Sequence, residues 1–353
     1  MSSSFSFKVI KKSNQTPARV GEITTPHGKI KTPCFMPVAT ASAIRCLDFK
    51  TLAEIGAQIS LGNTYHLHLR PGDELIKKAG GLHKYEAWSK PILTDSGGYQ
   101  VYSLAKSRKI TPRGVHFQSH IDGSTHFLSP EKSIKIQQNL GSDIMMVLDE
   151  CPASDCSHDY AAKSLDLTIK WAKRSKKAHT NQKQALFGII QGGLFKDLRL
   201  KSSAQLQKID FDGYAIGGLA VGESNQEMYK VLKYTLPTLP EGKPRYLMGV
   251  GTPENIRKAV SMGVDMFDCV LPTRNARHGF LYTSDGVVRI KQAKYKQDFT
   301  SLDPACTCYT CQNYTKSYLR HLIINNEPMS MYLNTLHNLS YYLNIMKAIR
   351  DSI

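Results

Sequence analysis

Short apolar runs alternate with longer polar or amphipathic stretches along most of the chain. Each apolar run has the length of a strand, ends in polar residues or glycine, and precedes a stretch with helical periodicity. After a first core strand within residues 19–40, the segments that contain these runs and their polar or glycine-rich ends are 57–62, 91–104, 143–152, 186–193, 214–223, 246–251 and 265–271. Repeated strand–helix units of this kind predict a parallel α/β architecture.

Local signals near the N-terminus add detail to this pattern. Residues 19–40 alternate apolar and polar positions around a Pro-His-Gly turn, which predicts a hairpin leading into the first core strand. A helix ending at Gly56 and a strand near 57–62 come next. We interpret the following stretch as a polar loop, which contains Asn63, His66, His68 and Arg70.

Turn and capping residues predict further elements. Residues 108–128 are rich in β-formers and contain an Asp-Gly turn at 122–123, which predicts a hairpin. A Ser-Pro pair at 129–130 then starts a helix that stops near Gly141. Later helices are predicted from a basic stretch at about 160–178, a Ser-x-x-Glu capping box at 224–227 and a Thr-Pro pair at 252–253.

About eight strand–helix units in one chain favour a (β/α)8 TIM barrel over an open sheet. In such a barrel the C-terminal strand ends share one mouth, so polar residues that are distant in sequence face one another. These strand-end residues are Asn63, Asp95, Ser96, Asp149, Gln191, Gly218, Met248 and Asp268. Capping of a local loop explains any one of them, but it explains the whole set poorly.

Asp268 ends an apolar run within residues 263–279, and a lone carboxylate is costly to bury there. It is either a structural acid that caps a loop or pairs with Arg274 or Arg277, or a catalytic group. The residue alone leaves both interpretations open.

The chain of 353 residues carries 46 Lys and Arg against 29 Asp and Glu, a formal net charge of +17. This excess favours a polyanionic partner such as nucleic acid, with a merely solvated lysine-rich surface as the alternative. Residues 1–15 lack the apolar core of a secretory signal, and no apolar run approaches a membrane span. We therefore expect a cytoplasmic protein with no membrane partner.

Cys306, Cys308 and Cys311 form a compact cysteine motif, and His337 follows in a helix-like segment. Three thiolates and one imidazole make a tetrahedral set suited to Zn²⁺, and four protein ligands indicate a structural site. His321 competes as the fourth ligand, while an iron–sulfur cluster would usually take a fourth cysteine. The other cysteines are scattered through a long chain, which favours metal ligation over disulfides.

Together with this motif, the segments TDSGGYQ, DECP, IIQGG, IGGLAVGE, YLMGVGTPENI and FDCVLPTRNARHG resemble tRNA-guanine transglycosylases, most closely the bacterial ones. The resemblance covers nearly the whole chain. It implies a catalytic (β/α)8 barrel over residues 1–295, with an N-terminal hairpin or sheet, and a zinc-binding subdomain with a C-terminal helix over 296–353. It also implies exchange of the wobble guanine of GUN-anticodon tRNAs, those for Asp, Asn, His and Tyr, for a 7-deazaguanine base in queuosine biosynthesis.

The resemblance assigns roles to individual residues. The family's nucleophile falls on Asp268, which would form a covalent intermediate with the ribose, and its general acid/base falls on Asp95. The base-binding residues would be Ser96, Tyr99, Asp149, Gln191, Gly218, Leu219 and Met248, with the ring between Tyr99 and Met248. The tRNA-binding residues would be Arg274, Asn275, Ala276, Arg277 and His278, and the zinc ligands Cys306, Cys308, Cys311 and His337.

Elementary chemistry agrees with these roles. Exchange of one N-glycoside for another with retention needs two displacements, so one carboxylate attacks and another group handles protons. A guanine-like edge has adjacent donors that a carboxylate such as Asp149 can accept, while Gln191 and a backbone N–H can meet its carbonyl oxygen. A base recognised in this way has left its stack, which fits a single-stranded loop.

The identity of the incoming base depends on fewer positions. Cys151 and Val221 match the bacterial choice where the family separates prequeuosine users from queuine users. This favours preQ1 (7-aminomethyl-7-deazaguanine), with queuine as the alternative. Residues 39–48 and His68 depart from the family pattern, which leaves contacts of the early loops open.

Bacterial members act as homodimers, and Tyr314, Tyr318 and His321 fall in the family's interface segment, although aromatic residues there would also suit a core. Two other classes of protein remain as alternatives. One is a catalytically silent barrel that binds tRNA as a subunit. The other is a metal-dependent hydrolase of the amidohydrolase type, for which His66 and His68 would be the ligands.

Overall fold

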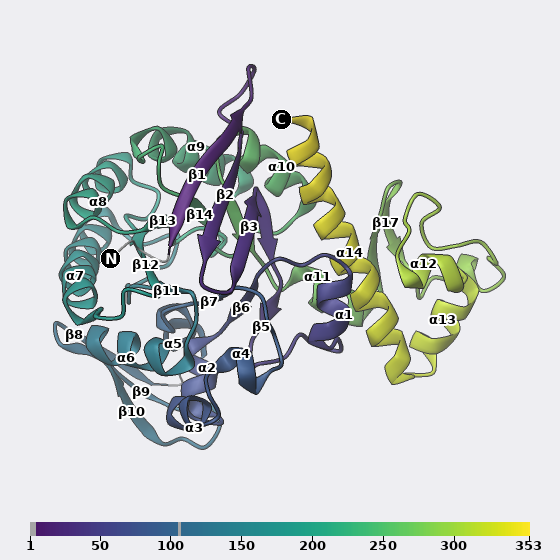
Figure 1. Ribbon diagram of the computed structural model, residues 1–353, viewed down its shortest axis with the longest axis horizontal. Coiled ribbons are helices and arrows are strands. Elements are labelled where there is room, and N and C mark those ends of the chain that lie inside the picture. Colours follow the sequence, from purple (N-terminus) through teal and green to yellow (C-terminus); the bar gives the residue numbers. More distant parts are fainter. Residues whose placement is uncertain (1–4, 105–106) are drawn as a thin grey trace.

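The computed structural model describes residues 5–104 and 107–353. Within this part, nine short parallel strands form one sheet in the order β4-β15-β14-β13-β12-β11-β7-β6-β5 (Figure 1). They are β4 (Cys34–Met36), β5 (Val38–Ala39), β6 (Ser60–Gly62), β7 (Ile92–Thr94), β11 (Ile144–Met146), β12 (Ala185–Ile190), β13 (Gly213–Ile216), β14 (Arg245–Leu247) and β15 (Met266–Asp268). Only Pro37 separates β4, which pairs with β15, from β5, which pairs with β6. The sheet therefore closes, and the predicted (β/α)8 barrel is confirmed.

Helices surround the strands, which are buried on both faces as parallel strands usually are (Figure 1). They are α1 (Phe49–Glu54), α2 (Thr64–Leu69), α3 (Asp73–Lys78), α4 (Leu82–Tyr85), α5 (Gly98–Leu104), α6 (Pro130–Leu140), α7 (His158–Ala178), α8 (Lys196–Ile209), α9 (Asn225–Thr235), the 3-10 helix η1 (Leu236–Thr238), α10 (Pro253–Ser261) and α11 (Leu271–His278). All six residues of β12 are buried, for example.

The predicted helix ends are confirmed where capping residues marked them. Ser129 accepts a hydrogen bond from the N–H of Lys132 at the start of α6, and Gly141 ends that helix in a left-handed conformation with φ 76°. Ser224 and Glu227 form the capping box of α9.

The prediction of a polar loop after β6 is wrong, because this stretch forms the helix α2. The side chain of Asn63 accepts a hydrogen bond from the N–H of His66 and caps the helix. Tyr65 and Leu67 are buried, so the helix alternates them with the half-buried His66 and His68. That alternation hid the helical character of the segment.

A three-stranded antiparallel sheet covers the N-terminal end of the barrel. It consists of β1 (Ser6–Lys12), β2 (Arg19–Thr25) and β3 (Gly28–Thr32), so the predicted hairpin is confirmed and β1 is added to it. Arg19 pairs with Asp265 at 2.6 Å, just before β15, and His27 contacts Asp143 at 2.8 Å, just before β11. Residues 1–4, which belong to the segment judged not to be a secretory signal, lie outside the described residues.

A second antiparallel sheet projects between α5 and α6. It contains β8 (Arg108–Thr111), β9 (Gly114–Gln118) and β10 (Thr125–Leu128), with the Asp-Gly pair at 122–123 between β9 and β10. The predicted hairpin is thus confirmed, and a third strand extends it.

The C-terminal region forms a smaller lobe beside the barrel (Figure 1). It contains β16 (Phe280–Thr283), β17 (Gly286–Arg289), the 3-10 helix η2 (Ala293–Tyr295), α12 (Tyr309–Asn313) and α13 (Lys316–Ile324). The 25-residue helix α14 (Pro328–Ser352) runs from this lobe back along the barrel. There Tyr342 donates a hydrogen bond to the carbonyl oxygen of Gly251, and Arg350 donates to that of Pro33 at 2.7 Å. The domain boundary between 295 and 296 stays a prediction.

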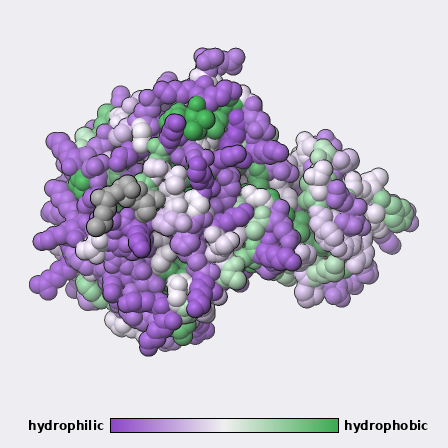
Figure 2. Space-filling view, viewed as in Figure 1, coloured by the Kyte–Doolittle hydropathy of each residue, from purple (hydrophilic) through white to green (hydrophobic). Residues whose placement is uncertain are grey.

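Hydrophilic residues predominate on the face drawn in Figure 2, and hydrophobic residues form small separate patches there. None of the helices among residues 5–104 and 107–353 combines the length and apolar character needed to span a bilayer.

Candidate active site

The C-terminal ends of the barrel strands open into a cavity of about 590 Å³, a size suited to a small ligand. Residues that the sequence assigned to catalysis, base binding or tRNA binding line it together: Asp95, Ser96, Tyr99, Asp149, Gln191, Gly218, Leu219, Met248, Asp268 and Arg274. The fold therefore brings both proposed catalytic carboxylates and the whole expected base pocket to one place.

Asp268, the last residue of β15, is held through one carboxylate oxygen. The hydroxyl of Tyr246 donates to Oδ1 at 2.6 Å, and the N–H of Gly249 donates to the same oxygen at 2.8 Å. Among the described residues, Oδ2 has no hydrogen-bond donor. Burial raises the pKa of Asp268, and the bonds from Tyr246 and Gly249 oppose this. One oxygen is thus fixed while the other stays available to a ligand in the cavity.

Asp95 follows β7 and is also buried. Its Oδ2 accepts from Nδ2 of Asn63 at 2.6 Å, and its Oδ1 accepts from the N–H groups of Thr64 and Gly97 at 3.0 and 3.2 Å. Burial raises its pKa to about 7, the nearby charge of Asp268 adds to this, and the backbone hydrogen bonds oppose it. A carboxyl group with such a pKa can release or accept a proton near neutral pH.

Asp149 forms a hydrogen-bonded group with Ser96 and Gln191. Its Oδ2 accepts from Nε2 of Gln191 at 2.7 Å, and its Oδ1 accepts from Oγ of Ser96 at 3.3 Å. Burial raises the pKa of Asp149 to about 6, and these two bonds oppose the rise. Gly98 permits the close packing, because a Cβ there would lie 2.7 Å from the carbonyl oxygen of Asp149.

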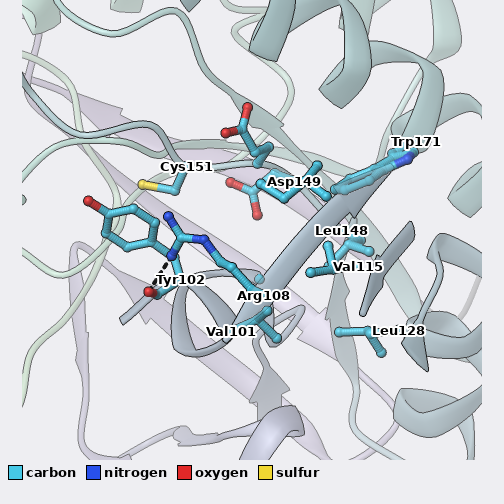
Figure 3. A pocket seen from close by; sticks show the side chains of 12 residues that line it. Val101, Tyr102, Arg108, Val115, Leu128, Leu148, Asp149, Cys151 and Trp171 are labelled. Carbon is cyan, nitrogen blue, oxygen red and sulfur yellow. Dashed lines mark hydrogen bonds between the residues drawn. The ribbon is translucent and has the colours of Figure 1, made fainter. Parts of the chain in front are cut away.

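A second, much smaller cavity of about 20 Å³ lies behind Asp149 and is shown in Figure 3. Its wall is largely apolar and includes Leu148 and Trp171. The guanidinium of Arg108 lies 4.2 Å from the ring centre of Tyr102 on the opposite side. This apolar backing explains why burial dominates the electrostatics of Asp149.

The residues expected to flank the base and to select it also line the main cavity. Tyr99 is 46% exposed, and Met248 is half-buried. Cys151 and Val221 border the same space. Burial raises the pKa of Cys151 to about 12, so at neutral pH it is a neutral thiol in the wall and not a nucleophile.

Sequence reasoning missed the groups that hold the two carboxylates. Asn63 was noted only as a polar strand end, and Tyr246 and Gly249 received no role. The signal for Tyr246 is its place on β14 two positions before Met248, because alternate residues of a strand face the same side. Nothing in the sequence marks the Gly249 N–H as a donor to Asp268.

Residues 274–278, the expected tRNA-binding segment, are not equally accessible. Arg274 and His278 are exposed, whereas the side chain of Ala276 is fully buried. Nδ2 of Asn275 donates to the hydroxyl of Tyr282 at 2.7 Å. Nη1 of Arg277 donates to the carbonyl oxygen of Thr273 at 2.9 Å.

Among the described residues, neither Arg274 nor Arg277 forms an ion pair with Asp268, which instead accepts from Tyr246 and Gly249. The interpretation of Asp268 as the partner of an arginine is therefore wrong.

The C-terminal lobe holds the predicted metal ligands. The Sγ atoms of Cys306, Cys308 and Cys311 lie 3.8, 3.6 and 3.2 Å from Nδ1 of His337, and together they could hold a metal ion. Nε2 of His337 lies 2.6 Å from the carbonyl oxygen of Tyr282. That contact takes the Nε2 proton and leaves the Nδ1 lone pair for the metal, so the donor set fits the ion.

His321 does not join this cluster. It is exposed on α13, where its Nδ1 contacts Nδ2 of Asn325 at 3.2 Å. His337 is therefore the fourth member of the predicted ligand set.

The two histidines considered as ligands of a hydrolytic metal centre, His66 and His68, have different surroundings. His66 borders the cavity, whereas Nδ1 of His68 contacts Asp73 at 2.7 Å. Within the described residues, the remaining candidate group is His27, His83 and Asp143 at the other end of the barrel. The rings of His27 and His83 stack 3.5 Å apart at 15°, so their in-plane lone pairs do not converge on one ion.

Comparisons with known proteins agree with this geometry. The family model described as Queuine tRNA-ribosyltransferase matches residues 13–353. A protein named Queuine tRNA-ribosyltransferase from Halothermothrix orenii is 55% identical over 350 residues, which cover 99% of this chain and 94% of that protein. Namesakes from Streptococcus equi subsp. equi and Francisella tularensis subsp. novicida are 57% and 55% identical over 98% of this chain and over 92% and 94% of their own lengths. The chain belongs to the queuine tRNA-ribosyltransferase family.

Proposed function

We propose that this enzyme exchanges the wobble guanine of GUN-anticodon tRNAs, those for Asp, Asn, His and Tyr, for preQ1 in queuosine biosynthesis. The observation that carries the proposal is the pair of buried carboxylates, Asp95 and Asp268, in one cavity with the Asp149–Gln191 pair. Such a cavity supplies a nucleophile, a proton carrier and a polar edge for a purine-like ring.

In the first displacement, Oδ2 of Asp268 attacks C1′ of the ribose. A bond forms between Asp268 and C1′ while the bond from C1′ to the guanine nitrogen breaks, and the electron pair leaves with guanine. Asp95 in its protonated form supplies the proton that the departing base takes up. The pKa of about 7 for Asp95 supports this role at neutral pH.

In the second displacement, Asp95 takes the proton from the incoming base, whose nitrogen attacks C1′ and releases the Asp268 carboxylate. Two inversions at C1′ give net retention, as in retaining glycosidases. The hydrogen bonds from Tyr246 and Gly249 to Oδ1 keep Asp268 oriented through both steps and stabilise the carboxylate as a leaving group.

Base recognition falls to the opposite side of the cavity. The carboxylate of Asp149 accepts from the adjacent ring and amino N–H groups, and Ser96 and Gln191 keep it in place. Tyr99 and Met248 hold the ring between them. Cys151 and Val221 favour preQ1, which has a small aminomethyl substituent, over the larger queuine.

The anticodon loop approaches the mouth beside Arg274, which is exposed and lines the cavity. The net charge of +17 supplies a long-range attraction to RNA that salt weakens. His278 and Arg277 extend the same surface. The target base leaves the loop to enter the cavity, which is easier for a single strand than for a duplex.

The proposed ion at Cys306, Cys308, Cys311 and His337 is one structural Zn²⁺ per subunit. When bound, it supplies a crosslink between the cysteine loop and α14 and takes no part in the reaction. A thiolate site of this kind and a tRNA substrate support a cytoplasmic location.

We further propose that the enzyme is a homodimer whose contact includes Tyr314, Tyr318 and His321. The rings of Tyr314 and Tyr318 stack 5.3 Å apart, and the ring of His321 stacks on that of Tyr318. The side chain of Tyr318 is exposed. Exposed aromatic rows of this kind are common at the centre of protein interfaces.

A base-exchange assay tests the proposed function. Wild-type protein should replace labelled guanine in a GUN-anticodon tRNA with preQ1 faster than with queuine, and Asp268→Asn should abolish covalent trapping while retaining tRNA binding. Asp166→Asn, a change on the exposed face of α7, is the matched control and should exchange normally. Normal turnover by Asp268→Asn would exclude that residue as nucleophile, and tRNA binding without exchange by wild type would favour the silent subunit.

A further inference from the structure

Arg199 on α8 is fully buried, although no sequence pattern assigns it a role. Its Nε donates to the carbonyl oxygen of Gly193 at 2.7 Å, and its Nη1 donates to those of Ile190 and Gly217 at 2.8 and 2.7 Å. Nη2 donates to the carbonyl oxygen of Gly218 at 3.4 Å. One side chain thereby ties the loop after β12 to the loop after β13, and both loops border the cavity.

This arrangement places a positive charge in the interior without a carboxylate. In the described part of the chain, the buried Arg19 forms an ion pair with Asp265, whereas Arg199 forms none. The hydrogen-bond acceptors of Arg199 among the described residues are all backbone carbonyl oxygens, although a buried charge without a paired carboxylate is costly. Burial lowers the pKa of Arg199 to about 10, so it remains charged at neutral pH. Lysine offers three donors and no planar fork, and so it cannot bind the same carbonyls.

The bound carbonyls fix the direction of two peptide groups. In a trans peptide the C=O and the N–H point in opposite directions. Because the oxygens of Gly217 and Gly218 face Arg199, the N–H groups of Gly218 and Leu219 face away from it, on the side of the cavity that both residues line. Among residues 5–104 and 107–353, neither N–H has a protein acceptor. The left-handed φ of 64° at Gly218 allows the successive peptides to adopt this geometry.

We infer that Arg199 is a positioning residue that presents these two N–H groups to a carbonyl oxygen of the bound base, and so makes the cavity select a 6-oxo ring over a 6-amino ring. Its charge also polarises both peptides and strengthens their N–H donors. A 6-amino group would place its own N–H against them and leave donors unpaired. The inference rests on the proposed function, because it concerns the base in that cavity.

The test measures free-base binding by calorimetry with guanine and 2,6-diaminopurine, which differ at the 6-position. Wild type should bind guanine more tightly. Arg199→Lys and Arg199→Gln should each reduce the ratio of the guanine affinity to the 2,6-diaminopurine affinity about 10-fold. Without Arg199, the N–H groups of Gly218 and Leu219 no longer point at the 6-position, so they neither bind the oxygen of guanine nor oppose the amino group of 2,6-diaminopurine. Equal weakening of both bases, or an unchanged ratio, would overturn the inference.

Arg19→Lys is the matched control, since it alters a buried arginine at the opposite end of the barrel. It should lower the melting temperature and leave the affinity ratio unchanged. A change of ratio in this control equal to that of Arg199→Lys would attribute the effect to general loosening and contradict the inference.

A measurement on the wild type keeps the inference testable if the Arg199 variants do not fold. In protein labelled with ¹⁵N, the amide resonances of Gly218 and Leu219 should move downfield with guanine and not with 2,6-diaminopurine, and identical shifts would count against the inference. These binding experiments need no tRNA. Absence of exchange with tRNA would therefore refute the proposed function while the affinity ratio still decides the role of Arg199.

Discussion

The hydroxyl of Tyr246 donates a 2.6 Å hydrogen bond to Oδ1 of Asp268, from a neighbouring strand of the barrel. Removal of this donor in Tyr246→Phe should raise the pKa of Asp268, because the bond stabilises its charged form. We expect kcat to fall about 10-fold and the acidic limb of the kcat/KM profile to move to higher pH. Tyr229→Phe, which loses a hydrogen bond to Asn255 outside the cavity lining, is the control. Superimposable pH profiles would exclude this role for Tyr246.

The raised pKa of Asp95 predicts a pH-dependent stability. Burial moves this pKa from 3.8 to about 7 in the folded protein, so the folded state holds the proton more tightly than the unfolded chain. Its contribution to the free energy of unfolding is thus complete below about pH 4 and is lost as the pH rises to about 7. The Asp95→Asn substitution removes the titratable group, so the variant does not lose this free energy of unfolding as the pH rises.

Chemical denaturation at pH 5 and pH 8 measures the effect. The variant should gain roughly 2–4 kcal/mol in unfolding free energy relative to wild type between these two pH values. Asp285→Asn, on an exposed turn, should show no such gain. A constant difference between Asp95→Asn and wild type at both pH values would contradict the assigned pKa.

Removal of the metal ligands should affect the C-terminal lobe first. If the proposed zinc ion binds there, Cys311→Ala should not retain it and should lose about 5 kcal/mol or more in stability, because binding free energy at such a site is folding free energy. Metal analysis and limited proteolysis of residues 280–353 measure this. Cys46→Ser, at an exposed cysteine, should retain one zinc per chain. Full zinc content in Cys311→Ala would exclude this ligand set.

The exposed Arg274 predicts a measurable salt dependence. In Arg274→Ala, the slope of log affinity for the tRNA against log salt concentration should fall by about 0.7–1, as for the loss of one phosphate contact. Arg277→Ala should change less, since its guanidinium is already bonded to Thr273. Lys170→Ala on the outer helix α7 is the control. An equal loss of slope in all three variants would assign the attraction to net charge alone.

The sequence predicted the elements whose signals are local. Ser129, Gly141 and the Ser224–Glu227 capping box mark helix ends through the residues next to them, and the barrel followed from repeated strand–helix units. The sequence did not predict elements whose structure depends on contacts with residues distant in the chain. The helix α2 forms because Tyr65 and Leu67 find buried contacts that the chain alone does not reveal.

The same limit applies to the site. Carboxylates at strand ends are visible in sequence, so Asp95, Asp149 and Asp268 could be found. The donors that orient them could not, because a backbone N–H such as that of Gly249 has no sequence signature. Arg199 illustrates the same difficulty, because its role depends on hydrogen bonds to four backbone carbonyl oxygens, which the sequence does not reveal.

The helix α14 also has a consequence for protein synthesis. It packs on β4, where the rings of Tyr342 and Phe35 lie 4.9 Å apart and Arg350 reaches the carbonyl oxygen of Pro33. The ribosome makes this helix after all strands of the barrel, whereas β4 is made before the other barrel strands. The nascent chain therefore carries an uncovered first strand until α14 has been made, and a stop codon between α13 and α14 would expose the beginning of the barrel as well as remove that helix.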